Sequence, residues 1–354
     1  MDLNSILKSM IEKKASDLIL KVGSPVCMRI NSQLHKDGTI LTEKDLEILA
    51  DDIISKSRIE KTKDHKEVVL SFSINEHGRF RATIFRQRGT LVIVIRAINT
   101  HVPGFEELNL PAKILEELCN EKRGLILVTG TTGSGKSTTV ASMLEYINKN
   151  MSKHIVTLEN PIEYTFVDKN SAVSQREIKI DTESFQSALE YIMLQTPDVI
   201  FIGDIRTSSI MGTALTAAET GQLVIANMHT INTSHTIEVI VNFFQPHQHP
   251  EIRMQLSLLL KGIVSLRLVP LKDGSGLVPA CEVLILSPTI AELIKEGKVD
   301  EIETYVKEGD LYGMQTFDQA LLKLYRADKI TKETALLYAE RKNELLMKIK
   351  GSYK

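Results

Sequence analysis

The sequence predicts an α/β protein with two domains, the second of which is built on a mostly parallel sheet. Its 354 residues are enough for two hydrophobic cores. From about residue 113 onward, short apolar segments alternate with helical segments, which is typical of a parallel sheet covered by helices. Pro103 and Gly104 interrupt the pattern before that change. We expect a first domain at 1–99, a linker at 100–112, a main α/β core at 113–285 and a helical C-terminal region at 286–354.

The first hundred residues have the pattern of a small α/β unit. A helical repeat of apolar residues starts at Ile6, and a strand candidate follows at 18–22. Residues 78–86 alternate between apolar and polar side chains, which predicts a strand with one buried face. A second strong strand candidate lies at 91–96.

Four segments of the second domain are short and nearly all apolar, as expected for strands that are covered on both faces. They lie at 125–128, 155–158, 199–202 and 223–226. In the C-terminal region, Thr316 and Gln319 precede an apolar run with the spacing of a capping box, which predicts the start of a helix.

The composition is that of an ordinary globular protein, with 43% hydrophobic and 25% charged residues. The formal net charge of −2 gives no overall positive field, so we expect no nucleic-acid partner. Cys27, Cys119 and Cys281 are far apart, which disfavours a metal cluster and fits a reducing compartment. The N-terminus does not resemble a signal peptide, and no apolar run approaches the ~20 residues that span a bilayer. We therefore expect a soluble intracellular protein.

Residues 130–137 match the phosphate-binding pattern G-x-x-x-x-G-K-[ST]. An apolar strand candidate runs into this segment and a helix-compatible segment follows it. In that arrangement, backbone N–H groups and the helix N-terminus hold phosphate oxygens. Lys136 would reach the β- and γ-phosphates, and Ser137 would be a ligand of Mg²⁺. The predicted nucleotide site comprises Gly130, Thr131, Thr132, Gly133, Ser134, Gly135, Lys136, Ser137 and Thr138.

Polar side chains follow the other three strand candidates of the second domain, where ligands of open α/β sheets bind. Glu163, Asp204 and His229 follow the second, third and fourth strand candidates. A carboxylate there could orient water or hold Mg²⁺ through a bridging water, and a histidine could sense the phosphate. Structural roles remain open for each: a helix-start carboxylate, a turn residue and a hydrogen-bonded core histidine, respectively.

Arginines are dense near the end of the first domain. They are Arg79, Arg81, Arg86, Arg88 and Arg96. Either they form a solvated basic face, or some of them neutralise triphosphate charge across a domain or subunit boundary, as an arginine finger does.

Further motifs extend over nearly the whole chain. They are ASDL (15–18), GRFR (78–81), LNLP (108–111), ENPIEY (159–164), TPDVI (196–200), AETG (218–221), NFF (242–244) and GMQTFDQA (313–320). With the phosphate-binding loop, these segments make the chain resemble the type IV pilus retraction ATPases, which are the PilT/PilU group of the type II/IV secretion ATPases. The resemblance is closer to the PilU branch.

This resemblance implies a PAS-like N-terminal domain, a RecA-like C-terminal domain and a homo-hexameric ring with ATP and Mg²⁺ bound between domains. It also implies a cytoplasmic location, peripheral to the inner membrane, with a pilus platform protein and a paralogous retraction ATPase as partners. By position, Glu163 matches the family's catalytic glutamate, Asp204 its Walker B glutamate and His229 the second histidine of its His box. Arg81 and Arg96 match N-terminal arginines that approach the nucleotide.

Several positions around the nucleotide depart from the family pattern. They are Asn160 (usually Asp), Leu194 and Val239 (usually Arg), Asp204 (usually Glu), Gln222 (usually His) and the box at 289–296, where one arginine is lost and Lys295 replaces another. The change at Asp204 withdraws a carboxylate by about 1.5 Å, the length of one carbon–carbon bond. Misplacement by about 1 Å can cost on the order of 10²-fold in rate.

We therefore expect ATP binding, with hydrolysis that is slow or dependent on a partner. Two functions remain in competition: a motor ATPase that drives pilus retraction, and a weakly hydrolysing ring subunit that assists a paralogous motor. A nucleic-acid motor is disfavoured by the near-zero net charge and the absence of Trp.

Overall fold

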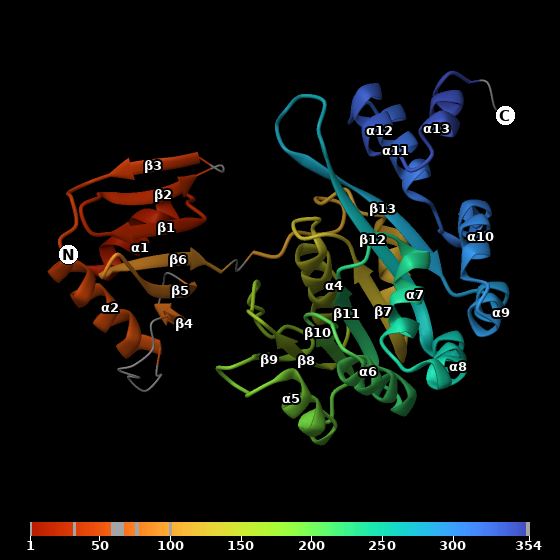
Figure 1. Ribbon diagram of the computed structural model, residues 1–354, viewed down its shortest axis with the longest axis horizontal. Helices are drawn as coiled ribbons and strands as arrows, with labels where there is room; N and C mark the ends of the chain where they lie inside the picture. The colour runs from red at the N-terminus through yellow and green to blue at the C-terminus, as the bar shows by residue number, and fades with distance from the viewer. Residues whose placement is uncertain (1, 31–32, 58–66, 75–77, 99–100, 352–354) are drawn as a thin grey trace. The chain divides into compact units, whose positions relative to one another are not determined.

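The computed structural model describes residues 2–30, 33–57, 67–74, 78–98 and 101–351 (Figure 1). The chain divides into two compact units. The first comprises the N-terminal residues to His101 together with Glu163–Thr165, and the second comprises Val102–Ile162 and Phe166–Lys354. Within the described ranges, no helix combines the length and the apolar character that a membrane span needs.

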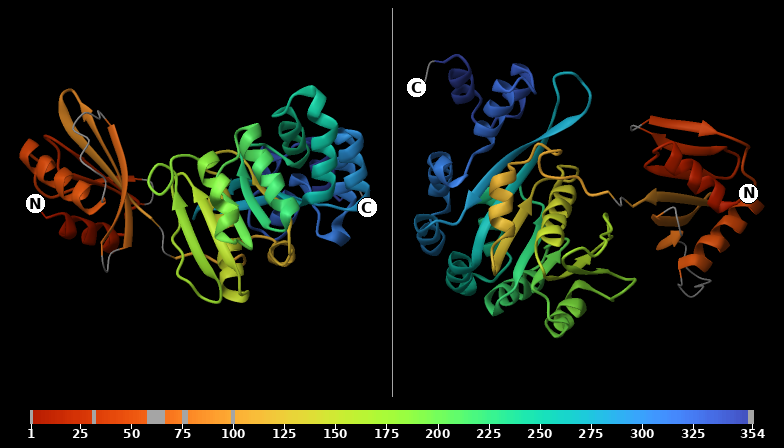
Figure 2. Two further views of the ribbon diagram at one scale, coloured as in Figure 1. Left: turned by 90° about the horizontal axis from the view of Figure 1, so that it is seen from below. Right: turned by 180° about the vertical axis from the view of Figure 1, so that it is seen from behind.

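The first unit is an antiparallel sheet with two described helices packed on one face (Figure 2). Its strand order is β3-β2-β1-β6-β5-β4. Its elements are α1 (Leu3–Glu12), β1 (Asp17–Lys21), β2 (Val26–Ile30), β3 (Gln33–Asp37), α2 (Glu43–Ser57), β4 (Glu67–Ile74), β5 (Gly78–Gln87) and β6 (Thr90–Ala97).

The alternation expected at 78–86 is confirmed, because Phe80, Ala82 and Ile84 of β5 all point into the core. Strand β3 was not predicted from the sequence. It lies at the edge of the sheet and all five of its residues are exposed, so it lacks the apolar alternation that reveals a half-buried strand.

The second unit contains a seven-stranded sheet in the order β13-β12-β7-β11-β10-β8-β9. All its pairings are parallel except that between β12 and β13, which confirms the expected mostly parallel sheet. The strands are β7 (Gly124–Thr129), β8 (His154–Glu159), β9 (Ala172–Glu177), β10 (Val199–Ile202), β11 (Leu223–Met228), β12 (Leu260–Pro270) and β13 (Leu277–Ile285). The four apolar segments identified in the sequence are the buried central strands β7, β8, β10 and β11.

Helices cover both faces of this sheet. Helices α3 and α4 pack in one core cluster, whereas α5 to α8 pack in another on the opposite face. The helices are α3 (Ala112–Cys119), α4 (Lys136–Asn150), α5 (Phe185–Ile192), α6 (Ser208–Thr220), α7 (Thr233–Asn242) and α8 (His249–Leu259), with short 3₁₀ turns at Met193–Gln195 and Pro246–Gln248.

After β13 the chain is helical, as expected. Helices α9 (Pro288–Glu296) and α10 (Ile302–Glu308) join the main core, with 3₁₀ turns at Val299–Glu301 and Asp310–Tyr312. Helices α11 (Phe317–Arg326), α12 (Lys332–Tyr338) and α13 (Lys342–Ile349) form a separate cluster against β12 and β13. The capping box of Thr316 and Gln319 is confirmed at the start of α11.

The parallel order places the carboxyl ends of β7, β8, β10 and β11 along one edge of the sheet. Ligands of open α/β sheets bind at such an edge. The loops that leave these four strands therefore define where a site is to be sought.

Candidate nucleotide-binding site

The loop between β7 and α4 has a positive φ, which favours glycine, at Gly130, Gly133 and Gly135. Gly130 has φ +143°, and a Cβ atom there would lie 2.4 Å from Ser134 Oγ and 2.6 Å from the Leu266 carbonyl oxygen. Gly135 has φ +96° and precedes the first residue of α4, and no side chain caps that helix. A tight loop that leads into an uncapped helix N-terminus is the geometry in which backbone N–H groups hold phosphate.

Lys136, the first residue of α4, is buried, with 7% of its surface exposed. Its Nζ donates hydrogen bonds to the carbonyl oxygens of Gly130 and Thr131, both at 2.8 Å. The ammonium group therefore lies over the loop. Ser137 and Thr138 follow in the same helical turn and are half-buried.

Asp204 and His229 leave neighbouring parallel strands, β10 and β11, and their side chains meet. His229 Nε2 lies 3.4 Å from Asp204 Oδ2. The same carboxylate oxygen forms an ion pair with Arg206 Nε. Arg206 was not predicted from the sequence, although it lies only two residues after Asp204. The carboxylate is thus already engaged by two nitrogen-bearing side chains.

Three buried oxygens at this edge of the sheet have no hydrogen-bond partner among the described residues: Ser134 Oγ, Asp204 Oδ1 and Asn227 Oδ1. Buried polar atoms normally have a partner, so oxygens of this kind fit a site that takes up a ligand, ion or water. Carboxylate and hydroxyl oxygens are the ligand type that Mg²⁺ prefers. The residues at this edge therefore fit a bound magnesium–nucleotide complex.

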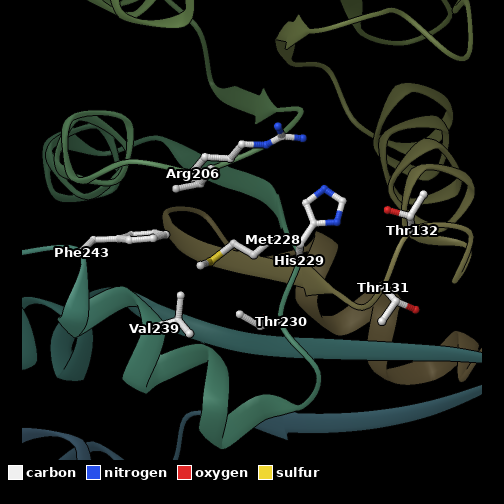
Figure 3. Close-up of a pocket in the computed structure, with 9 residues that line it drawn as sticks. Thr131, Thr132, Arg206, Met228, His229, Thr230, Val239 and Phe243 are labelled. Atoms are coloured by element: carbon white, nitrogen blue, oxygen red, sulfur yellow. The ribbon is translucent and has the colours of Figure 1, made fainter.

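A cavity of about 650 Å³ lies beside the loop (Figure 3). The threonines of the loop lie at one end, Arg206 and His229 lie in the middle, and an apolar group lies at the other end (Figure 3). The lining comprises Thr131, Thr132, Ile205, Arg206, Met228, His229, Thr230, Val239 and Phe243. Both loop threonines and His229 were predicted from the sequence, and Val239 was noted as a departure from the family pattern. The apolar lining by Met228 and Phe243 was not predicted, because it depends on how the end of β11 and the end of α7 lie together.

Comparisons with known proteins agree with this geometry. The family model described as "Type II/IV secretion system protein" matches residues 1–351. The chain belongs to the type II/IV secretion system protein family. Within this secretion family, a relative named type IV pilus ATPase PilU, from Pseudomonas aeruginosa, is 40% identical over 99% of this chain and 92% of its own length. The PilT retraction ATPase of the same organism is 36% identical over 95% of this chain and 97% of its own length.

A crystal structure of the pilus retraction motor PilT with bound ADP matches this secretion-family chain with a TM-score of 0.90. The two are 42% identical, and the match covers 97% of this chain and 98% of the other. The resemblance to the PilT/PilU group is therefore confirmed, as are the fold class, which combines an N-terminal domain with a RecA-like domain, and the assignment as a P-loop ATPase.

The structure gives physical meaning to the departures from the family pattern. Val239 lines the cavity, so an apolar side chain stands where the family usually has a cation. Gln222 precedes β11 and therefore lies at the opposite edge of the sheet from His229. Leu194, in the 3₁₀ turn after α5, is 79% exposed. Among these three positions, only Val239 is a lining residue of the described cavity.

A carboxylate that the sequence analysis did not single out lies at the end of β8. Glu159 is 7% exposed and accepts hydrogen bonds from Thr157 Oγ1 at 2.7 Å and Gln175 Nε2 at 3.1 Å. A carboxylate directly at a strand end was the available signal. Glu163 is exposed and lies outside the compact unit that holds the loop, and its catalytic role stays a prediction.

Arg81 and Arg96 are brought together on one face of the first unit's sheet. They are directly opposite each other in the pairing of β5 with β6. Arg96 Nε donates to Asp17 Oδ1 at 2.7 Å, and Arg29 lies 3.5 Å from the other oxygen of Asp17. The carboxylate of Asp17, which is paired with Arg96 across β1 and β6, offsets the repulsion between the two arginines. Their approach to a nucleotide stays a prediction.

Gly130→Ala tests the loop geometry. The added Cβ would overlap Ser134 and the Leu266 carbonyl group, so the loop must shift. We expect the affinity for ADP, measured by isothermal titration calorimetry, to fall about fivefold or more, since strain of this kind costs roughly 1–3 kcal/mol. Gly212→Ala in α6 is the matched control, because its Cβ would meet nothing within 4 Å. Unchanged ADP affinity in Gly130→Ala would contradict the assigned geometry.

Proposed function

We propose that this chain binds ATP with Mg²⁺ and works as a ring-forming ATPase of a type IV pilus machine, coupling hydrolysis to pilus retraction. The observation that carries the proposal is the buried Lys136 held across a glycine loop, beside the contact between Asp204 and His229. The similarity to PilU and PilT over nearly the whole chain supports the pilus assignment.

In this proposal each side chain has one role. Lys136 binds the β- and γ-phosphates, and Ser137 and Asp204 hold Mg²⁺, which neutralises phosphate charge when bound. His229 contacts the carboxylate of Asp204 and senses the γ-phosphate. Glu163 orients the attacking water. Arg81 and Arg96, which share one sheet face, neutralise developing charge in the manner of arginine fingers.

The proposed assembly follows the family. Six copies form a ring with a PAS-like domain at 1–99, a linker at 100–112, an ATPase core at 113–285 and a helical region at 286–354. The ring lies in the cytoplasm, peripheral to the inner membrane, on a pilus platform protein and beside a paralogous retraction ATPase. Nucleic acid is not among the proposed partners, because the net charge is only −2.

A second candidate function is a weakly hydrolysing subunit that assists the paralogous motor. It is favoured by two observations on the cavity. Val239 puts an apolar side chain on its wall, and the shortened carboxylate of Asp204 is paired with Arg206. Both features weaken the stabilisation of developing charge more than they weaken the binding of phosphate.

Asp204→Glu separates the two functions. The longer side chain moves its carboxylate outward by about 1.5 Å, so we expect steady-state ATP hydrolysis to rise on the order of tenfold or more. Lys136→Ala gives the background rate. A rate that stays unchanged or falls in Asp204→Glu would show that the retracted carboxylate is not the limiting defect. If the unaltered chain is indistinguishable from Lys136→Ala, the autonomous-motor proposal fails and the assisting subunit is left.

The proposed ring is tested by mass. In the presence of Mg²⁺ and a non-hydrolysable ATP analogue, light scattering coupled to size-exclusion chromatography should give the mass of six copies of the 39.6-kDa chain. The analogue stabilises whichever state binds it. Because Lys136→Ala should bind the analogue more weakly, this variant should need a higher analogue concentration to reach the mass of the ring. A monomer at every nucleotide concentration would contradict the ring.

A further inference from the structure

The segment after His229 is fixed to β13 by a buried carboxylate. Glu282 of β13 is 3% exposed, and its Oε1 accepts hydrogen bonds from the backbone N–H and the hydroxyl of Thr233, both at 2.8 Å. Thr233 is the first residue of α7 and lies four positions after His229. Burial raises the pKa of Glu282, and the two bonds from Thr233 oppose that shift. A costly buried carboxyl group thus holds the beginning of α7.

The same segment is contacted by Arg267 of β12. Its Nη2 donates to the carbonyl oxygen of Ile231 at 3.4 Å, two residues after His229. Its guanidinium carbon lies 3.8 Å from the ring centroid of Phe317, the first residue of α11. The guanidinium also donates to the carbonyl oxygen of Tyr338 at 3.4 Å and pairs with the carboxylate of Glu340. One planar side chain therefore joins the His229 segment to the cluster of α11 to α13.

The C-terminal cluster is attached to the same two strands. The Nε2 of Gln315 donates to the carbonyl oxygen of Cys281 at 2.8 Å, and Gln315 also pairs with Val283 as a β-bridge. Ser265 of β12 contacts Thr129, the residue directly before Gly130. Their hydroxyl oxygens lie 2.6 Å apart, within hydrogen-bonding distance. Strands β12 and β13 thus contact the phosphate loop, the His229 segment and the C-terminal helices.

These contacts exceed what packing alone needs. Helices α11 to α13 have an apolar cluster of their own around Phe317 and Leu321, distinct from the two clusters that flank the central sheet. Burying the carboxylate of Glu282 beside that cluster costs desolvation, which an apolar residue would avoid. Arg267 is a quarter exposed, yet its guanidinium is held by Ile231, Tyr338, Glu340 and the ring of Phe317. Polar groups that reach the backbone of one particular segment instead fix its position.

We propose that Arg267 and Glu282 are positioning residues of the ATPase site, through which the helices α11 to α13 set the position of His229. The inference deepens the proposed function and rests on the proposed role of His229. A partner that moves α11 to α13 would then alter ATP turnover without touching the nucleotide.

Arg267→Ala tests the inference in the full chain. We expect kcat for ATP to fall about tenfold while KM stays within about twofold, because the phosphate loop is untouched and the catalytic geometry is loosened. Hydrogen exchange of the amides in 229–236 should become faster. Arg326→Ala, an exposed arginine at the end of α11, is the matched control and should change neither quantity. The proposal would be overturned if Arg267→Ala and Arg326→Ala had the same kcat and the same hydrogen exchange in 229–236.

A double-mutant cycle separates this inference from the role of His229 itself. If Arg267 acts through His229, the double variant Arg267→Ala/His229→Ala should be no slower than His229→Ala alone. The proposal would be overturned if the loss in kcat of the double variant equalled the product of the losses in the two single variants. If His229→Ala keeps the original kcat, the proposed role of His229 has failed instead. In that case the hydrogen-exchange difference between Arg267→Ala and Arg326→Ala still decides whether the segment is held by Arg267.

Conservative replacements complete the test. Glu282→Gln keeps an acceptor oxygen for Thr233 and a similar volume, so we expect kcat and the hydrogen exchange of 229–236 to stay near those of the unaltered chain. Glu282→Ala removes the acceptor, so we expect a lower kcat and faster exchange. Arg267→Lys keeps the charge but loses the planar stacking on Phe317, so its kcat should lie between those of the unaltered chain and Arg267→Ala. The proposal would be contradicted if Glu282→Gln lowered kcat as much as Glu282→Ala did while the two variants had the same melting temperature. The hydrogen bonds to Thr233 would then not position the segment.

Discussion

The arrangement of the nucleotide site depends on one close approach of backbone to backbone. Strand β12 lies parallel beside β7, and the Leu266 carbonyl oxygen comes so near to Gly130 that a Cβ atom there would be only 2.6 Å away. This contact closes the loop beneath Lys136. The parallel order of β7, β11, β10 and β8 then brings Asp204 and His229 to the same edge of the sheet. The proposed phosphate loop and the contact between Asp204 and His229 thus both follow from one strand order.

The sequence predicted the parts of the site that depend on local patterns. The phosphate loop, the four buried strands and the polar residues at their ends are each encoded within a few neighbouring residues. The hairpin of β12 and β13 and the apolar lining of the cavity were missed, because they depend on contacts between residues far apart in the chain. Arg206 was missed although it lies only two residues after Asp204, because the sequence pattern does not show that its side chain turns back onto that carboxylate. Gln222 makes the same point: its place at the far edge of the sheet follows from the direction of β11, which the motif does not encode.

The site combines a complete phosphate cradle with an altered catalytic side. The glycines, the buried Lys136 and the uncapped start of α4 have the geometry that we propose for nucleotide binding. On the proposed catalytic side, Asp204 stands where the family resemblance implies a longer glutamate and is paired with Arg206, and the apolar Val239 lines the cavity where the resemblance implies an arginine. Binding energy depends on the first group, whereas stabilisation of charge that develops during reaction depends on the second. We therefore expect this chain to hold ATP better than it hydrolyses it.

That claim is tested most directly by following ATP that is already bound. The chain, in excess over radiolabelled ATP and with Mg²⁺, would be quenched at a series of times, and the ATP and ADP recovered from the protein would be separated and counted. We expect most of the nucleotide bound to the unaltered chain to be still ATP at times when the Asp204→Glu variant has converted its bound ATP to ADP. Conversion in the unaltered chain as fast as in Asp204→Glu would contradict it.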